Sequence, residues 1–74
     1  MTKDELIYGL NYNMEEIVKY KNNIKDKDRY EFLLIEIDEV INKINRVKHN
    51  YKKSTLLHLK SASSELLDRC MTIK

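Results

Sequence analysis

The sequence contains no proline, no tryptophan and a single glycine, Gly9. Tight turns and β-hairpins depend on glycine and proline, so 74 residues with only one of them do not fit an all-β fold. The single cysteine, Cys70, excludes a disulfide within the chain and suits a reducing compartment such as the cytoplasm. Because Cys70 stands among Leu66, Leu67 and Ile73, we predict a small buried side chain rather than a reactive thiol.

Long apolar runs are also missing. The longest covers residues 32–35, far short of the ~20 residues that span a bilayer, and no segment has the pattern of a signal peptide. We therefore expect no membrane partner. A chain of this size buries only about 60% of its unfolded surface, so a core of its own is marginal and association with a second copy is favoured.

The most regular feature of the sequence is a row of apolar residues in its middle. They recur at alternating steps of three and four, which is the a/d spacing of three heptads on one helix. The row consists of Tyr30, Leu33, Ile37, Val40, Ile44, Val47 and Tyr51. We predict a helix that begins near Asp28, where Glu31 completes a capping pattern, and that buries this seam against other helices or a second copy.

A second helix is predicted at the N-terminus, where Thr2 and Glu5 form a capping-box pattern. The apolar stripe of this helix is Ile7, Leu10, Met14, Ile17 and Ile24, and Leu6 and Val18 broaden it. Gly9 lies inside the stripe, where it either admits a neighbouring helix closely or ends a short first turn. We favour one unbroken helix, followed by a polar loop over residues 22–28.

A third helix is predicted because the seam changes register after Tyr51. The later apolar residues fall at Leu56, Leu59, Leu66, Cys70 and Ile73, which do not continue the heptads. We expect a connection near residues 52–54, a cap at Ser54 and a helix over about 55–72. The small residues 61–64 mark either a close helix crossing or a break. The predicted fold is all-α and one domain, a three-helix antiparallel bundle or a helical hairpin plus a third helix, and we expect a homodimer.

Catalytic and metal-binding patterns are weak. The carboxylate pairs Glu15/Glu16 and Asp38/Glu39 are expected on solvated helix faces, where no dry pocket tunes their acidity. No glycine-rich phosphate loop occurs. The histidines, at positions 49 and 58, are nine residues apart and lack the three- or four-residue spacing of metal ligands on one helix. We expect no enzyme, no cofactor and no metal site.

One stretch resembles an enzyme family. Residues 33–46 are similar to the first helix of all-helical chorismate mutases, with Ile37 and Asp38 at its Ile-Asp step and Arg46 at its later arginine. Leu34 occupies the position where that pattern has a carboxylate-binding arginine. No active-site residue is therefore carried over to this chain.

The charge distribution contains a long gap. Residues 40–64 include no acidic residue, and their six cationic side chains are Lys43, Arg46, Lys48, Lys52, Lys53 and Lys60. Since the whole chain carries +2, the remainder carries −4. A patch of this kind either follows nucleic-acid phosphates or complements the negative C-terminal end of a helix dipole.

These features favour a binding function. We expect a small regulatory, adaptor or inhibitor protein that covers a surface of a protein partner. Eleven lysines against three arginines, with many Asn, Ile and Tyr, are what an AT-rich coding sequence produces, and they point to a phage or mobile element. The alternative is a nucleic-acid-binding helical dimer that uses the acid-free basic segment 40–64.

Overall fold

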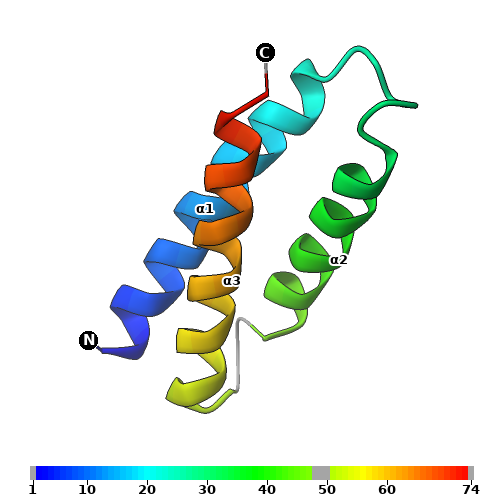
Figure 1. The fold of residues 1–74 in the computed structure, drawn as a ribbon. Helices are drawn as coiled ribbons and strands as arrows, with labels where there is room; N and C mark the ends of the chain where they lie inside the picture. Colours follow the sequence, from blue (N-terminus) through cyan, green and yellow to red (C-terminus); the bar gives the residue numbers. More distant parts are fainter. Residues whose placement is uncertain (1, 48–50, 74) are drawn as a thin grey trace.

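The computed structural model describes residues 2–47 and 51–73, which form three helices (Figure 1). These are α1 (Lys3–Asn23), α2 (Glu31–Val47) and α3 (Lys53–Met71). They form an elongated bundle of 38 × 18 × 15 Å in which α1 and α3 run side by side in the same direction and α2 runs antiparallel to both. The described residues contain no strand, and the prediction of an all-α three-helix bundle is confirmed.

The start of α1 confirms the predicted capping box. The Thr2 hydroxyl accepts a hydrogen bond from the Glu5 backbone N–H at 3.2 Å, and the Glu5 carboxylate accepts one from the Thr2 N–H at 3.2 Å. The helix continues through Gly9 without a break and ends at Asn23, after which Ile24 is extended. One helix, not two, therefore carries the N-terminal apolar stripe.

The start of α2 corrects the predicted cap at Asp28. The carboxylate of Asp26 accepts the Arg29 N–H at 3.1 Å, and its carbonyl accepts the Tyr30 N–H at 3.3 Å. Residues 27–30 form a turn, and regular helix begins only at Glu31. An aspartate two residues earlier stabilises this entry because its side chain and carbonyl bind the turn's free N–H groups.

The end of α2 corrects the predicted length of the central helix. The helix stops at Val47, and Tyr51 lies beyond it with 43% of its surface exposed. A helix continued through Tyr51 would carry the chain away from the bundle. Ending at Val47 lets the chain return, so that Leu56 of α3 packs into the same cluster as Val47.

The predicted third helix is present, with its start displaced. It begins at Lys53, and Lys52 precedes it without a side-chain capping hydrogen bond, so Ser54 is a residue of the first turn and not the cap. The helix runs unbroken through residues 61–64. The alternative interpretation of these small residues, a close crossing with another helix, is the one that the structure supports.

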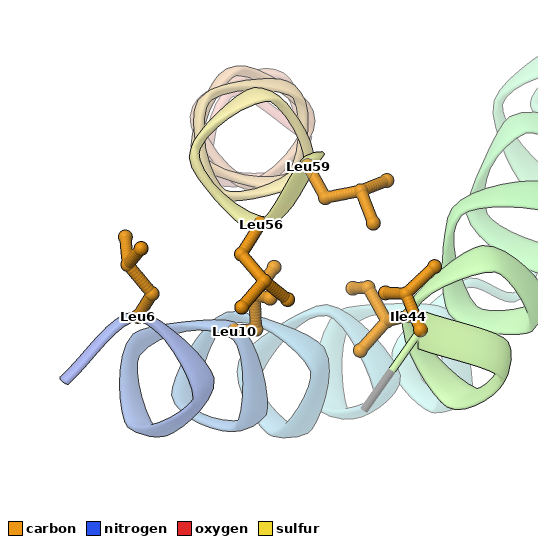
Figure 2. Close-up of a cluster of buried hydrophobic side chains, with 6 residues drawn as sticks. Leu6, Leu10, Ile44, Leu56 and Leu59 are labelled. Carbon is orange, nitrogen blue, oxygen red and sulfur yellow. The ribbon is translucent and has the colours of Figure 1, made fainter. Parts of the chain in front are cut away.

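The core consists of two apolar clusters with a polar contact between them. The lower cluster, at the end of the bundle where α1 begins, contains Leu6, Leu10, Ile44, Val47, Leu56 and Leu59 (Figure 2). The upper cluster contains Ile17, Ile37, Leu66 and Cys70. Between them along α1 and α3, the buried Asn13 amide donates hydrogen bonds to the hydroxyls of Ser63 at 2.9 Å and Ser64 at 3.0 Å. Val40 of α2 packs against both clusters.

The buried face of α1 differs from the predicted stripe by a small rotation. Leu6, at the edge of the predicted stripe, and Asn13, which the stripe did not include, are buried, whereas Ile7 and Met14 are only half-buried. The reason is that α1 packs mainly against α3, and this contact covers the side of α1 that bears Asn13. A periodicity in apolar residues cannot detect this, because the residue at the centre of the contact is polar.

Candidate functional surfaces

The central seam lies largely inside this one chain. Ile37 and Ile44 are fully buried and Val47 nearly so, whereas Tyr30, Leu33 and Val40 are half-buried. These side chains pack against α1 and α3, so the buried part of the seam is not free to bind a second copy. Tyr51, the last seam residue of the prediction, lies outside α2.

The edges of α2 are held by charged side chains. On one side, the Lys21 ammonium of α1 lies 2.6 Å from the Asp38 carboxylate. On the other side, the Arg69 guanidinium of α3 pairs with the Glu36 carboxylate, and the hydrogen bond and charge of Glu36 raise the pKa of Arg69. Solvent-exposed pairs of this kind contribute about 0–1 kcal/mol each, so they orient α2 more than they stabilise it.

The outer face of α2 leaves large apolar side chains in water. Phe32 is 79% exposed and Ile35 is 49% exposed, and their spacing of three residues places them on one face of the helix. The sequence contained a signal for this surface. Residues 32–35 are four consecutive apolar residues, which on a helix point in every direction, so burying Leu33 against the bundle turns Phe32 and Ile35 outward.

The outer face of α1 carries two exposed tyrosines. Tyr8 is 76% exposed and Tyr12 is 54% exposed, and their spacing of four places them one above the other. They lie opposite the face that buries Leu6 and Leu10. The spacing of the two tyrosines is visible in the sequence, although none of the predictions above includes this pair.

The predicted basic segment is divided by the fold. Lys43 and Arg46 are exposed on the last turns of α2, and Lys52 and Lys53 are exposed at the start of α3, at the same end of the bundle. Lys60 lies apart from them, with its side chain across Gly9 of α1. Lys48 lies outside the described residues. Lys43 and Arg46 lie on α2 and Lys53 lies on α3, so no single helix carries the cationic side chains of this segment.

The two members of each carboxylate pair lie in different surroundings. Glu16 pairs with Lys19 at 3.4 Å, while its neighbour Glu15 is exposed. Asp38 pairs with Lys21, whereas Glu39 lines a groove of about 210 Å³ between α2 and α3. Adjacent residues on a helix point about 100° apart, so neither pair converges on one atom.

The remaining reactive side chains are Cys70 and the histidines. Cys70 is fully buried, as predicted, and burial raises the pKa of its thiol, which disfavours the nucleophilic thiolate. His58 is exposed on α3, and His49 lies outside the described residues. Within residues 2–47 and 51–73, no group of three His, Cys, Asp or Glu side chains is arranged to hold a metal ion. None of the described helices is long and apolar enough to cross a membrane.

Comparison with known protein families, with curated proteins and with solved structures finds no match to this chain.

Proposed function

We propose that this chain is a non-enzymatic regulatory, adaptor or inhibitor protein that acts by binding a protein partner. The observation that carries the proposal is the pair Phe32 and Ile35 on the outer face of α2, 79% and 49% exposed. Burying a side chain such as phenylalanine contributes about 1.5–3 kcal/mol of stabilisation. A complementary protein surface that buries this pair would therefore bind favourably.

The surroundings of this pair resemble the anatomy of a protein interface. Glu31 and Glu39 are exposed on the same helix beside the apolar pair. Protein interfaces combine an apolar centre with a polar rim that sets orientation and partner choice. We name the surface formed by Phe32, Ile35 and this rim the α2 face.

In the absence of another partner, we propose that the α2 face is buried against a second copy of the chain. The buried seam is occupied by α1 and α3, so a homodimer would form through the α2 face, with the same patch contributed by both chains. A protein partner that binds the α2 face would then compete with dimerisation. Such competition suits a regulator or inhibitor.

Composition supports the setting that we propose for this activity. A lone buried thiol suits a reducing cytoplasm. The excess of lysine over arginine is typical of AT-rich coding, which favours a phage or mobile element of a low-GC bacterium.

The experiment combines sedimentation equilibrium with a single reversal on the α2 face. We expect the 8.9 kDa chain to form dimers at micromolar concentration and the Phe32→Glu variant to remain monomeric, because a carboxylate cannot be buried there without a partner. Ser61→Glu, at an exposed position of α3, is the matched control and should still dimerise. A monomer mass for the unmodified chain across that range would contradict the homodimer.

Partner binding is tested by capture from a lysate of the source, with and without nuclease. We expect the unmodified chain to retain a protein after nuclease treatment and Phe32→Glu to lose it, while Ser61→Glu keeps it. A captured protein that is equally retained by Phe32→Glu would contradict the assignment of the α2 face.

Nucleic-acid binding is the second candidate, and one observation favours it. Arg46, Lys52 and Lys53 are exposed at the same end of the bundle, where the end of α2 and the start of α3 meet. Clustered cations bind phosphates by releasing condensed counterions. We rank this candidate second because Lys60, about two turns further along α3, is half-buried across Gly9 and is therefore less available to phosphates than the exposed cations.

A further inference from the structure

A second surface, on α1, combines aromatic side chains with negative charge. Tyr8 and Tyr12 form an exposed row, and Asp4, Glu5 and Glu15 are exposed on the same outward half of the helix. We name these five residues the α1 face. Two cations border this face: Lys19, which pairs with Glu16 at 3.4 Å, and Lys60 of α3, whose side chain lies across Gly9, so the three carboxylates leave a small net negative charge.

The helix itself explains only part of this composition. Glu5 completes the capping box, and Asp4 stands in the first turn, where a negative charge favours the helix dipole. Neither effect explains two tyrosines in water one turn apart, nor Glu15 beyond them. Tyrosine is enriched at protein interfaces because its ring presents a large contact area at a low cost in conformational entropy.

A hollow of about 470 Å³ borders this surface, lined by Asp4, Glu5, Tyr8, Gly9 and Lys60. The Lys60 side chain passes across Gly9 so closely that its Cε lies 2.6 Å from where a β-carbon on Gly9 would stand. The aliphatic stem of Lys60 therefore forms one border of the hollow, and Tyr8 and the two acidic residues form the rest. A long basic side chain from another protein would meet the same chemistry along the rest of the α1 face.

We propose that the α1 face is a docking surface for an arginine- and lysine-rich segment of a partner protein. Its carboxylates attract basic side chains, and the faces of Tyr8 and Tyr12 bind guanidinium groups through cation–π contacts. The same carboxylates disfavour nucleic-acid phosphates and anionic lipids, so we assign the face to a basic protein segment.

This inference goes beyond the proposed function, which rests on the α2 face. The outer side of α1 points away from α2 and α3, and the outer side of α2 points away from α1 and α3. The two surfaces can therefore bind at the same time, as an adaptor requires. Dimerisation through the α2 face leaves the α1 face of each chain free.

The test is an NMR titration of the 74-residue chain, labelled with nitrogen-15. The probe is an arginine- and lysine-rich helical peptide of about four turns, and a glutamate-rich peptide of equal length is its control. We expect saturable amide shifts centred on Tyr8 and Tyr12 with the basic peptide only. Shifts centred on the α2 face or on the end of the bundle near Lys53, or shifts without a centre, would overturn the proposal.

Variants distinguish binding by the tyrosine side chains of the α1 face from general charge attraction. Replacing both tyrosines (Tyr8→Ala with Tyr12→Ala) should weaken binding about tenfold or more, and Tyr8→Phe with Tyr12→Phe should keep most of it because the rings remain. Tyr51→Ala, which removes an exposed tyrosine outside α1, is the matched control and should bind like the unmodified chain. Equal binding by the double alanine variant, with circular dichroism showing it folded, would overturn the proposal.

Phe32→Glu distinguishes this inference from the proposed function. It should abolish dimerisation and leave the affinity for the basic peptide unchanged. If Phe32→Glu also abolishes peptide binding, the peptide uses the α2 face and the inference on α1 fails, while the proposed function stands. If the chain is a monomer that still binds the peptide at Tyr8 and Tyr12, the homodimer fails and the α1 face stands.

Discussion

The two helix contacts of α1 are built from different kinds of residue. Against α3, the contact includes small and polar residues, with Lys60 lying across Gly9 and the Asn13 amide bound to two serines. Against α2, it consists of aliphatic side chains such as Ile44 and Val47, with the Lys21–Asp38 ion pair at the edge. The first contact is the most extensive in the described part of the chain.

The two contacts have different roles: the α1–α3 contact fixes the register of the helices, and the α1–α2 contact contributes apolar burial. Hydrogen bonds are directional, so sliding α3 along α1 by one turn would leave the buried Asn13 amide without its serine partners. Aliphatic contacts are not directional and fix the position of α2 less tightly. The α1–α3 pair therefore defines the arrangement, while α2 contributes apolar surface beyond what the bundle covers. That surplus is the α2 face.

The largest expected effect tests whether α2 is an integral part of the bundle. Ile44→Ala should lower the free energy of unfolding by about 2–5 kcal/mol, because Ile44 is fully buried and its removal leaves a cavity. Ile44→Asp should unfold the protein, since a buried carboxylate without a partner is far more costly. Thermal melts followed by circular dichroism measure both. An unchanged melt for Ile44→Asp would show that α1 and α3 form a stable pair without α2.

The next effect tests the polar contact between α1 and α3. Asn13→Ala should cost about 1–3 kcal/mol, because two buried hydrogen bonds are lost and a small cavity forms. Asn42→Ala, at an exposed position of α2, should change stability by less than about 0.5 kcal/mol. Urea unfolding provides both values.

A double-mutant cycle identifies the contact. If the hydrogen bond to Ser63 carries part of the cost, Asn13→Ala should be less harmful in a Ser63→Ala background. Additive costs would mean that Asn13 matters only through its volume, and the account of register given above would be wrong.

Much of the fold could be predicted from the sequence, because apolar spacing and capping residues are local signals. The Thr2–Glu5 box, the unbroken α1 and the change of register before Leu56 were all visible. Asn13 could not be recognised as buried, since its partners lie fifty residues away on α3. The displaced cap at Asp26 was missed because two aspartates compete in one short loop, and local pattern does not say which one the chain uses.

The functional surfaces were less predictable than the fold. The basic segment looked continuous in sequence, but Lys60 is half-buried with its side chain across Gly9 of α1, whereas Lys53 is exposed about two turns earlier on α3. Four consecutive apolar residues at 32–35 indicate that some of them stay exposed, but the sequence does not show whether another element or a second copy covers Phe32. Apolar patterns predict what is buried better than what remains uncovered.

A smaller effect is expected at the close approach of α1 and α3. Gly9→Ala should gain up to about 1 kcal/mol of helix propensity, partly offset because the new methyl group displaces the Lys60 side chain. The Gly9→Ala, Lys60→Ala double variant removes that clash, so the substitution at Gly9 should give its full gain in this background. Urea unfolding of the four chains tests this. A loss of stability from Gly9→Ala in both backgrounds would mean that the α3 backbone, not the lysine stem, limits the approach.

The smallest effect is expected from reversing charge at the end of the bundle where α2 and α3 meet. Arg46 and Lys53 are exposed, so Arg46→Glu with Lys53→Glu should leave helicity nearly unchanged. If the chain binds proteins, nucleic acid should bind weakly or not at all at physiological salt, and the double variant should change little. Fluorescence anisotropy with labelled duplex DNA and RNA, repeated over a range of salt, measures this.

The nucleic-acid candidate predicts a different result for the same variant. Each neutralised phosphate on duplex DNA lowers log K by about 0.9 per unit of log salt, so four to six contacts would give a slope of roughly −4 to −5. The double variant removes two contacts and adds two repelling charges, so binding should be lost. Tight, salt-sensitive binding that disappears in this folded variant would make the end of the bundle, and not the α2 face, the principal functional surface.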